Sequence, residues 1–565
     1  MTTPSTPSPS RRSRFRAATA LALALGVAAF ALVLAVTDPP GPGLDPDAMA
    51  YLGAAVSLAY HGRYDVPMSE WASADTASPL THFPPGFPTA IALPVRLGMS
   101  APQAARLVVA LSAFVTVALV AWIVGTATAT WWAGALAAIL LAATPALVDA
   151  HLSVLSEPLF LACLAGALAL MSRPAAGRAD ELPAGTARLL ALGTVAAAAA
   201  LVRYAGIAVP AAAALWTLLV PTRGRSWRAR VRDAALVALP AILFVGAWGA
   251  RNALLASGGD PAAAAAPRAR PPYLAGFADD LTLGAHTARD WLAPLVEPER
   301  LQSVVAVIAV ALVVLLLAAA LLRAAHARGD GNDGDVPTAV TRVIAAAGLL
   351  LAAYVGEVVA SRLFVYGTIP FDERIFAPVI VLVEVVVATA LGGWWRVRRE
   401  RRGLRRAMSR AARGAAALAV LAWTIGSVML TQQNLAWVLE NGSDFAGPQW
   451  RQSALLQYVR THAADRPLYS NWPPAIYFHL GRAAHDLPQS LDGPTLTAFG
   501  RRLSAQRGLV VAFTAPSPDV ASPDSIARRL GLRRVARFDD GTAWESRAAA
   551  AATHGLQHST RQARP

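Results

Sequence analysis

The chain has 565 residues, of which 55% are hydrophobic and only 15% carry a charged side chain. Soluble domains contain about a quarter charged residues, so this composition indicates a membrane protein. The net charge of +15 comes from arginine alone, since the sequence has no lysine, and it gathers in short loops between apolar runs. That arrangement follows the positive-inside rule and excludes a nucleic-acid-binding face. A single cysteine, Cys163, excludes intramolecular disulfides and cysteine-based metal sites.

Long apolar runs recur along the chain. The first, 17–37, follows a basic N-terminus of residues 1–16 that we expect to be cytoplasmic. About twenty apolar residues span a bilayer, and no cleavage site follows this run, so the pattern indicates an uncleaved signal anchor. With the later runs it predicts about eleven spans in a transmembrane domain of residues 17–431, although the two runs within 187–220 are short. The later runs lie at 103–128, 131–149, 153–171, 187–202, 204–220, 234–255, 302–323, 340–361, 374–395 and 413–431.

Arginine-rich loops indicate the orientation. If the N-terminus is cytoplasmic, the inside loops include 173–188, 221–233 and 396–413, and the last two are the most basic stretches of the chain. The loops then expected outside, 38–102 and 252–301, are acidic or balanced. Because cytoplasmic loops carry the excess of positive side chains, the sequence predicts a multi-pass protein of the cell (plasma) membrane. Its active site and C-terminal region are expected to be extracytoplasmic.

The composition becomes that of a soluble domain after about residue 432. Helices are expected near 448–463, in PPAIYFHLGR and near 523–530, and strands in PLYSN and GLVVAFT. The stretch RRVARFDDGTAWES predicts a hairpin around its DDG turn. We therefore expect a mainly α, polytopic helical bundle with interfacial helices in its first outside loop. It is followed by a small extracytoplasmic α/β domain, 432–548, and a disordered tail, 549–565.

The acidic start of the first outside loop has two readings. Asp45 fits the cap of a helix that begins at Pro46, with Asp47 in the first turn beside the positive end of the helix dipole. Alternatively, a carboxylate at the outer membrane surface serves as the general base for an acceptor hydroxyl or amine. Tyr51 lies four residues after Asp47, so both fall on one face of the helix.

Two further polar residues stand at turns between apolar stretches. His82 precedes the rigid turn FPPG, where a histidine is more often structural than catalytic but could contact a sugar or a phosphate. Glu157 lies between Ser156 and Pro158 at the outer start of an apolar run. Helix capping explains this pattern, yet it also places a carboxylate at the edge of an outer cavity.

Several arginines lie at the outer ends of spans, where the positive-inside rule does not expect them. Arg203 lies between two apolar runs, Arg251 lies near the end of another, and Glu373-Arg374 begins a third. Each could be an interfacial anchor whose side chain reaches the bilayer surface. Together they favour a cavity for a lipid-linked phosphate, because the guanidinium fork makes bidentate hydrogen bonds with phosphate.

Motifs of other enzyme classes are missing from the sequence. No phosphate-binding loop, dinucleotide fingerprint, HExxH or GxSxG stands in a credible context. The sequence therefore gives no sign of nucleotide hydrolysis, redox chemistry or zinc. It names no certain cofactor and leaves a divalent metal open.

The series of motifs resembles the C-type (GT-C) superfamily of integral-membrane glycosyltransferases. The most similar branch is that of the dolichyl-phosphate-mannose–protein mannosyltransferases and bacterial aminoarabinose transferases. The matching pieces cover residues 45 to about 482, and the specificity lies in their order because each motif alone is weak. In chain order they are DPDAMAYLGAAVSLAYHGRY, HFPPGFP, LSEPLF, LVRYAG, ARN, FDERIFAPV and YSNWPPAIYFHLGR.

The resemblance implies transfer of a sugar from a polyprenyl-phosphate donor, with inversion, to a glycan, lipid or protein acceptor of the cell envelope. It assigns the base to Asp47, with Asp45 second. It assigns the donor phosphate to Arg203 and Arg374, and the sugar or acceptor to Glu157 and His82. Beside these we expect Arg251 to contact the phosphate, and Tyr51, Glu373 and Asn471 to contact the sugar or acceptor. The family's first loop often carries adjacent acidic residues, whereas Pro46 separates them here, which leaves the base and a metal requirement open.

Two other functions compete with a glycosyltransferase. A transporter or flippase for lipid-linked sugars predicts ionisable residues near mid-span and an inverted repeat, whereas the charges noted above lie at outer span ends. A non-catalytic membrane scaffold, whose C-terminal domain binds cell-wall polymers, predicts that Asp47 is replaceable if a cap is kept. A glycosyltransferase with membrane lipids around it and no nucleic-acid partner fits the sequence best.

Overall fold

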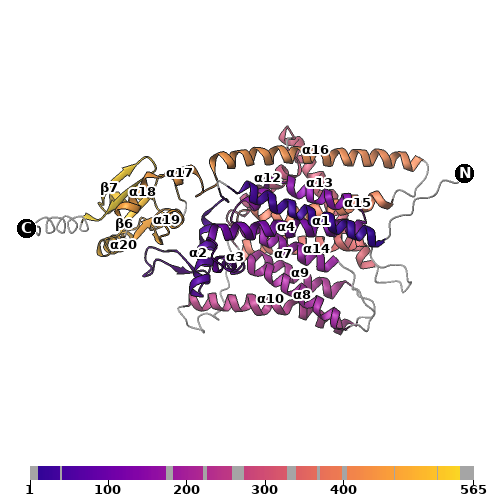
Figure 1. Cartoon of the computed structure of the whole chain (residues 1–565), viewed down its shortest axis with the longest axis horizontal. Helices are drawn as coiled ribbons and strands as arrows, with labels where there is room; N and C mark the ends of the chain where they lie inside the picture. The colour runs from indigo at the N-terminus through magenta and orange to yellow at the C-terminus, as the bar shows by residue number, and fades with distance from the viewer. Residues whose placement is uncertain are drawn as a thin grey trace, which may run out of the picture. The chain divides into compact units, whose positions relative to one another are not determined.

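The structure is a computed structural model of the whole chain (Figure 1). It describes residues 11–38, 41–172, 182–220, 226–257, 273–294, 296–326, 339–365, 369–397, 404–463, 465–517 and 520–547. Several sequence predictions fall wholly or partly outside these residues. They are the cytoplasmic N-terminus 1–16, the loops 173–188, 221–233, 252–301 and 396–413, and the disordered tail 549–565.

The chain divides into two compact units. One, here called the helical unit, comprises Met1–Thr37, Phe83–Phe87 and Arg106–Trp437. The other, here called the mixed unit, comprises Asp38–His82, Pro88–Ala105 and Val438–Pro565.

The helical unit consists of helices, most of which are apolar. In a bilayer every backbone N–H and C=O must bond within the protein, and a helix satisfies them inside one segment. Its elements are α1 (Arg11–Val36), most of α4 (Ala101–Thr128), α5 (Trp131–Ala143), α6 (Pro145–Leu152), α7 (Glu157–Ser172), α8 (Leu182–Val202), η1 (Tyr204–Ile207), α9 (Ala208–Leu219), α10 (Trp227–Ala256), α12 (Phe277–Leu292), α13 (Glu299–His326), α14 (Ala339–Phe364), α15 (Glu373–Val397) and most of α16 (Leu404–Asn441).

The chain is a multi-pass membrane protein, with fewer clear spans than the sequence predicted. Among the described residues, eight helices are long and apolar enough to cross a membrane, or nine if α5 and α6 are counted as one span bent by 70°. Each predicted run contains a helix, but α7 and the segment Tyr204–Leu219 are too short to count. A helix of 16 residues, such as α7, is only about 24 Å long, less than the roughly 30 Å hydrocarbon core. Helix length therefore supports eight or nine spans, not eleven.

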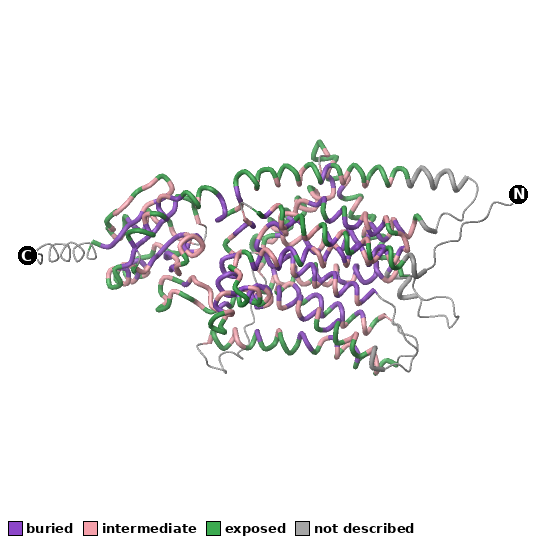
Figure 2. Tube along the Cα trace, viewed as in Figure 1, coloured by how far each residue is buried: buried purple, intermediate pink, exposed green. Residues whose placement is uncertain are grey.

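Burial distinguishes central from peripheral helices in this unit (Figure 2). In the most apolar 18-residue stretch of α15, 67% of the stretch is buried inside the protein. The corresponding stretches of α13 and α16 are only 11% buried. Figure 2 shows α16 exposed along most of its described length. Because these exposed side chains are apolar, we assign those surfaces to lipid contact.

The mixed unit combines the first outside loop with the C-terminal region. Its helices are α2 (Pro46–His61), most of α3 (Gly86–Arg96), α17 (Pro448–Arg451), α18 (Ala454–His462), α19 (Pro473–Leu480), α20 (Gly493–Ala505) and α21 (Pro523–Arg529). Its strands are β1 (Asp65–Val66), β2 (Met68–Ser69), β3 (Ser78–Pro79), β4 (Leu468–Ser470), β5 (Ala484–Asp486), β6 (Leu509–Phe513), β7 (Arg533–Phe538) and β8 (Gly541–Glu545).

A mixed sheet in the C-terminal region is confirmed. Six strands are ordered β2-β5-β4-β6-β8-β7, parallel from β2 to β6 and antiparallel from β6 to β7. The predicted hairpin is β7–β8, whose register pairs Phe538 with Gly541. The sequence analysis missed β5, α20 and the edge strand β2. The domain boundaries 432–548 stay a prediction.

The first outside loop contacts this sheet through β2, which pairs with β5, and through the residues after β2. Ser69 pairs with His485 of β5, and its Oγ lies 2.9 Å from His485 Nδ1. Trp71 packs edge-on against Phe499 of α20, with ring centroids 5.7 Å apart. Arg502, also on α20, donates to the carbonyl oxygens of Ala72 and Ser73. Residues more than 400 positions apart in the sequence thus form one sheet edge.

The buried His485 makes this sheet edge sensitive to acid. Burial lowers the pKa of His485 below the usual histidine value of 6.5, the carbonyl of Glu70 acts in the opposite direction, and the charge of Arg502 lowers it further. His485 therefore binds a proton more readily in the unfolded chain than in the folded one. The free energy of unfolding consequently decreases as pH falls below about 6.5. We expect hydrogen exchange of β5 amides in the full chain to lose protection between about pH 7.5 and 5.5. In His485→Gln this pH dependence should flatten, and equal slopes in both proteins would contradict the assignment.

Candidate active site

A buried carboxylate bound by two arginines is the centre of the helical unit's candidate site. Glu157, the first residue of α7, is 1% exposed. Its Oε1 lies 2.6 Å from Arg203 Nη1 and accepts a hydrogen bond from Arg374 Nε at 2.8 Å. The three residues, here called the arginine cluster, were predicted as separate candidates, and the structure brings them together.

Local backbone features place Arg203. The residue lies in an extended break between α8 and η1, with φ −142° and ψ 140°. Gly206 fits there because a Cβ would overlap with the carbonyl oxygen of Ala199, and Gly86 comes similarly close to Leu201. Arg203 Nη1 also donates to Ser156 Oγ at 3.2 Å, so the residue before Glu157 helps to hold the guanidinium.

A helix start places Arg374. It is the second residue of α15, and Asp372 precedes the helix. Asp372 Oδ1 accepts a hydrogen bond from Ile375 N at 3.1 Å, which is the capping role that Asp favours at a helix N-terminus. Glu373, the first residue of α15, is exposed. Its contact with a sugar or an acceptor stays a prediction.

The arginine cluster has the electrostatics of an anion site. Two guanidinium groups contact the carboxylate of Glu157, and the side chains of Arg203 and Arg374 are 16% and 37% exposed. Glu357 of α14 also acts on Arg203 by its charge, while its Oε1 accepts from Ser361 at 2.6 Å. Positive charge costs free energy at the edge of a bilayer, and a bound phosphate would offset that cost while using the guanidinium forks.

Arg251 belongs to a neighbouring polar group on α10. Its guanidinium lies 4.4 Å from the centre of the Trp248 ring, and Nη1 donates to Asn252 Oδ1 at 2.8 Å. Trp248 Nε1 and Asn252 Nδ2 both donate to the hydroxyl of Tyr204, at 3.1 and 3.3 Å. Tyr204 directly follows Arg203, so this group is linked to the arginine cluster through η1.

The candidates in the first outside loop lie in the mixed unit. Asp45 caps α2, because its Oδ1 accepts from Ala48 N at 2.9 Å, and Pro46 opens the helix. Asp47 lies in the first turn and is half-buried, and Tyr51 on the same helix is 2% exposed. The capping reading is thus confirmed for Asp45, which leaves Asp47 as the better candidate for a base.

His82 and Asn471 also belong to the mixed unit. His82 is exposed in the turn before Pro84. Asn471 is 3% exposed, and its side chain bonds to the backbone of Phe513 in both directions, at 2.9 and 3.0 Å, and to Ala515 O at 3.0 Å. These bonds give Asn471 a role in holding the loop after β4. Contact of either residue with the sugar or the acceptor stays a prediction.

A metal site has no obvious ligands in the part of the chain that the structure describes. There, no group of three or more His, Cys, Asp or Glu side chains is arranged to hold an ion. Sequence reasoning also missed Glu357 and Ser361. Both lie inside an apolar run, and a hydropathy pattern gives no signal that relates them to Arg203.

Comparisons with known proteins point to the same family as the motifs. Residues 82–248 match the family model of dolichyl-phosphate-mannose-protein mannosyltransferases. That segment includes Glu157 and Arg203. A search of curated proteins found no match.

This similarity to the mannosyltransferase family covers residues 82–248, less than a third of the chain.

Three solved structures resemble this chain. The oligosaccharyltransferase of Archaeoglobus fulgidus in its apo form is 11% identical with a TM-score of 0.50, over 88% of this chain and 69% of that one, and it shares the fold. ArnT from Cupriavidus metallidurans, bound to undecaprenyl phosphate, is 15% identical with a TM-score of 0.48, over 93% and 97% of the two chains. The arabinofuranosyltransferase AftD from Mycobacteria is 14% identical with a TM-score of 0.43, over 95% and 40%.

A double-mutant cycle tests the arginine cluster. Glu157→Ala leaves two guanidinium groups without their shared carboxylate, and breaking a buried ion pair costs about 3–5 kcal/mol of unfolding free energy. Arg203→Met in the same chain removes one of the two charges that have lost Glu157. We therefore expect the double variant to lose less unfolding free energy than the sum of the losses in the two single variants. Unfolding in detergent measures all three variants.

The matched control is Arg63→Ala. The Arg63 side chain is 73% exposed and pairs with Asp65 at 3.0 Å, so its loss should cost at most about 1 kcal/mol. If the losses of unfolding free energy in Glu157→Ala and Arg203→Met add up in the double variant, the proposed coupling between the two side chains is contradicted.

Proposed function

We propose that this protein is a membrane glycosyltransferase of the GT-C superfamily. In this proposal it takes its sugar from a polyprenyl-phosphate donor and transfers it to a glycan, lipid or protein acceptor of the cell envelope outside the cytoplasm. The observation that carries the proposal is the arginine cluster, in which Arg203 and Arg374 share the single carboxylate of Glu157. The matching family model, whose description names a lipid-phosphate sugar, supports the donor class. Both observations favour an enzyme over a transporter or a scaffold.

In the proposed reaction Asp47 is the base and the arginines bind the leaving group. Asp47 takes the proton from the acceptor hydroxyl or amine, and the acceptor atom forms a bond to the anomeric carbon. The bond from that carbon to the phosphate oxygen breaks, and its electron pair stays on the polyprenyl phosphate. Arg203 and Arg374 stabilise the negative charge that develops there. Attack opposite the leaving group inverts the anomeric centre, and no covalent enzyme intermediate is needed.

Glu157 acts as a positioning residue in this proposal. It holds the two guanidinium groups by one oxygen, and its Oε2 is buried without a hydrogen-bond partner among the described residues. A carboxylate in that place would repel a phosphate if it were not paired with both cations. Arg251 is the third candidate for the phosphate, and it is linked to Tyr204 through Asn252.

Replacing the proposed base tests its role. We expect Asp47→Asn to lower transfer from a radiolabelled polyprenyl-phosphate sugar by at least about 100-fold, because a general base contributes roughly 10²–10⁴ in rate. Asp45→Asn is the control, since asparagine also caps a helix and should keep transfer near the wild-type rate. Loss in Asp45→Asn with normal transfer in Asp47→Asn would move the base to Asp45, and normal transfer in both would end the base assignment.

Replacing each arginine by lysine tests phosphate binding. Lysine keeps the charge but loses the fork, so Arg203→Lys and Arg374→Lys should each weaken inhibition by polyprenyl phosphate at least about tenfold, the effect of one or two hydrogen bonds to a charged group. Arg63→Lys, at an exposed site, is the control. Unchanged inhibition in both variants would place the phosphate elsewhere.

A further inference from the structure

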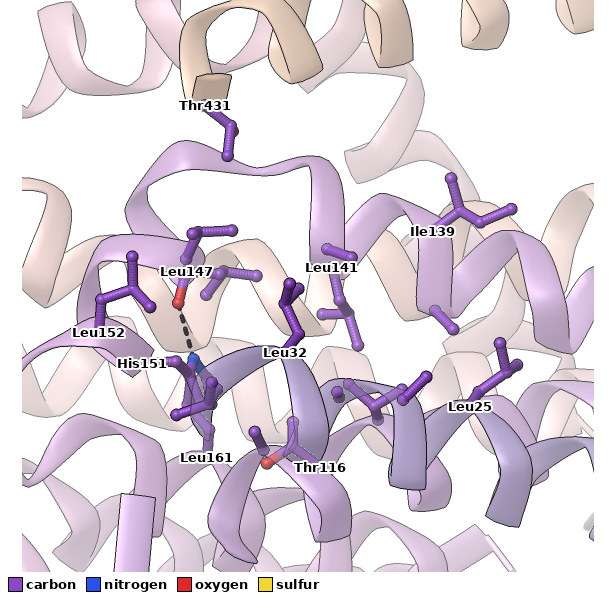
Figure 3. A pocket seen from close by; sticks show the side chains of 18 of the residues that line it. Leu25, Leu32, Thr116, Ile139, Leu141, Leu147, His151, Leu152, Leu161 and Thr431 are labelled. Atoms are coloured by element: carbon purple, nitrogen blue, oxygen red, sulfur yellow. Dashed lines mark hydrogen bonds between the residues drawn. The ribbon is translucent and has the colours of Figure 1, made fainter. Parts of the chain in front are cut away.

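The helical unit contains an apolar cavity apart from the arginine cluster. Its volume is about 280 Å³, and residues of α1, α4, α5, α6, α7, α15 and α16 line it (Figure 3). Leucines form much of the wall, among them Leu25, Leu32 and Leu161. Leu32 is 53% exposed and Ile139, also in the wall, is 49% exposed, so the wall reaches the apolar outer surface of the unit. Lipid chains of the membrane therefore have access to it.

Polar side chains in the wall are few. Thr431 lines the cavity, but its hydroxyl donates to Ala143 O at 2.9 Å. Thr116 is 2% exposed, and its Oγ1 is buried without a hydrogen-bond partner among the described residues. His151 Nε2 is likewise buried and without a partner in that part of the chain. An unpaired polar atom in an apolar wall costs about 1–3 kcal/mol, which a ligand can recover.

The hydrogen bond of His151 fixes which atom its ligand must supply. Nδ1 lies 2.7 Å from Leu147 O, and a carbonyl oxygen only accepts, so Nδ1 carries the proton (Figure 3). Nε2 of the neutral ring is then a bare acceptor that requires a donor. The hydroxyl of Thr116 can donate as well as accept. Together His151 and Thr116 suit a group that both gives and takes one hydrogen bond.

We propose that this cavity binds a long-chain alcohol, or a membrane lipid that carries one hydroxyl on a hydrocarbon chain. The chain packs against the leucines, and the hydroxyl donates to His151 Nε2 and accepts from Thr116 Oγ1. A lipid phosphate does not fit, because the residues that line the cavity include no Arg. A lone water does not fill it either, since the volume is about nine times the roughly 30 Å³ share of one water molecule.

A photolabelling experiment on the full chain in lipid nanodiscs tests the ligand chemistry. The probe is dodecanol with a diazirine in its chain, and the competitors are dodecanol, dodecyl methyl ether and dodecane. We expect dodecanol to compete at least about fivefold better than the ether, which cannot donate to His151, because one hydrogen bond is worth about that factor. Equal competition by all three would show only non-specific hydrophobic partitioning and would overturn the proposal.

Variants place the site on the two polar residues. Thr116→Val keeps the shape and removes the hydroxyl, and His151→Phe removes Nε2, so each should reduce labelling about fivefold. The control is Thr126→Val on the same helix, where the hydroxyl already donates to Trp122 O at 2.6 Å, and its labelling should not change. Labelling that is equal in Thr116→Val and Thr126→Val would overturn the proposal. If His151→Phe fails to fold, Thr116→Val and the competitor series still decide.

Discussion

The buried carboxylate of Glu157 is the constraint on which the helical unit depends. An ionised side chain buried 99% in an apolar setting is tolerated only when its charge is matched at contact distance. Arg203 and Arg374 supply that match from the α8–η1 break and from the start of α15. Three segments of the chain must therefore come together before any of these charges can be buried. The same requirement leaves two guanidinium forks beside one carboxylate, which is the arrangement proposed to hold a phosphate.

The mixed unit ties the helix of the proposed base to the C-terminal sheet. Leu44, just before α2, forms a bridge with Asp444, and Phe445 N donates to Leu44 O at 3.1 Å. Further along the loop, Ser69 joins the sheet beside His485. The start and the far side of the loop are thus held by the C-terminal region. That region is expected to position Asp47 even though none of its own residues is proposed to react.

The sequence predicted features whose signal is local. The apolar runs, the cap at Asp45 and the final hairpin each follow from residues within a few positions of one another, and the structure confirms them. Contacts between distant segments have no such signal. Glu157 and Arg374 are 217 positions apart, and a strand of two residues such as β2 shows no alternation of side chains. Sequence reasoning named these site residues through a resemblance, while their pairing required the fold.

The most direct measurement is a cryo-EM structure of the full chain in nanodiscs with saturating undecaprenyl phosphate. The account predicts the phosphate within hydrogen-bond distance of both Arg203 and Arg374, with Glu157 still contacting at least one of them. Phosphate bound elsewhere, with neither arginine within hydrogen-bond distance of it, would contradict the central claim.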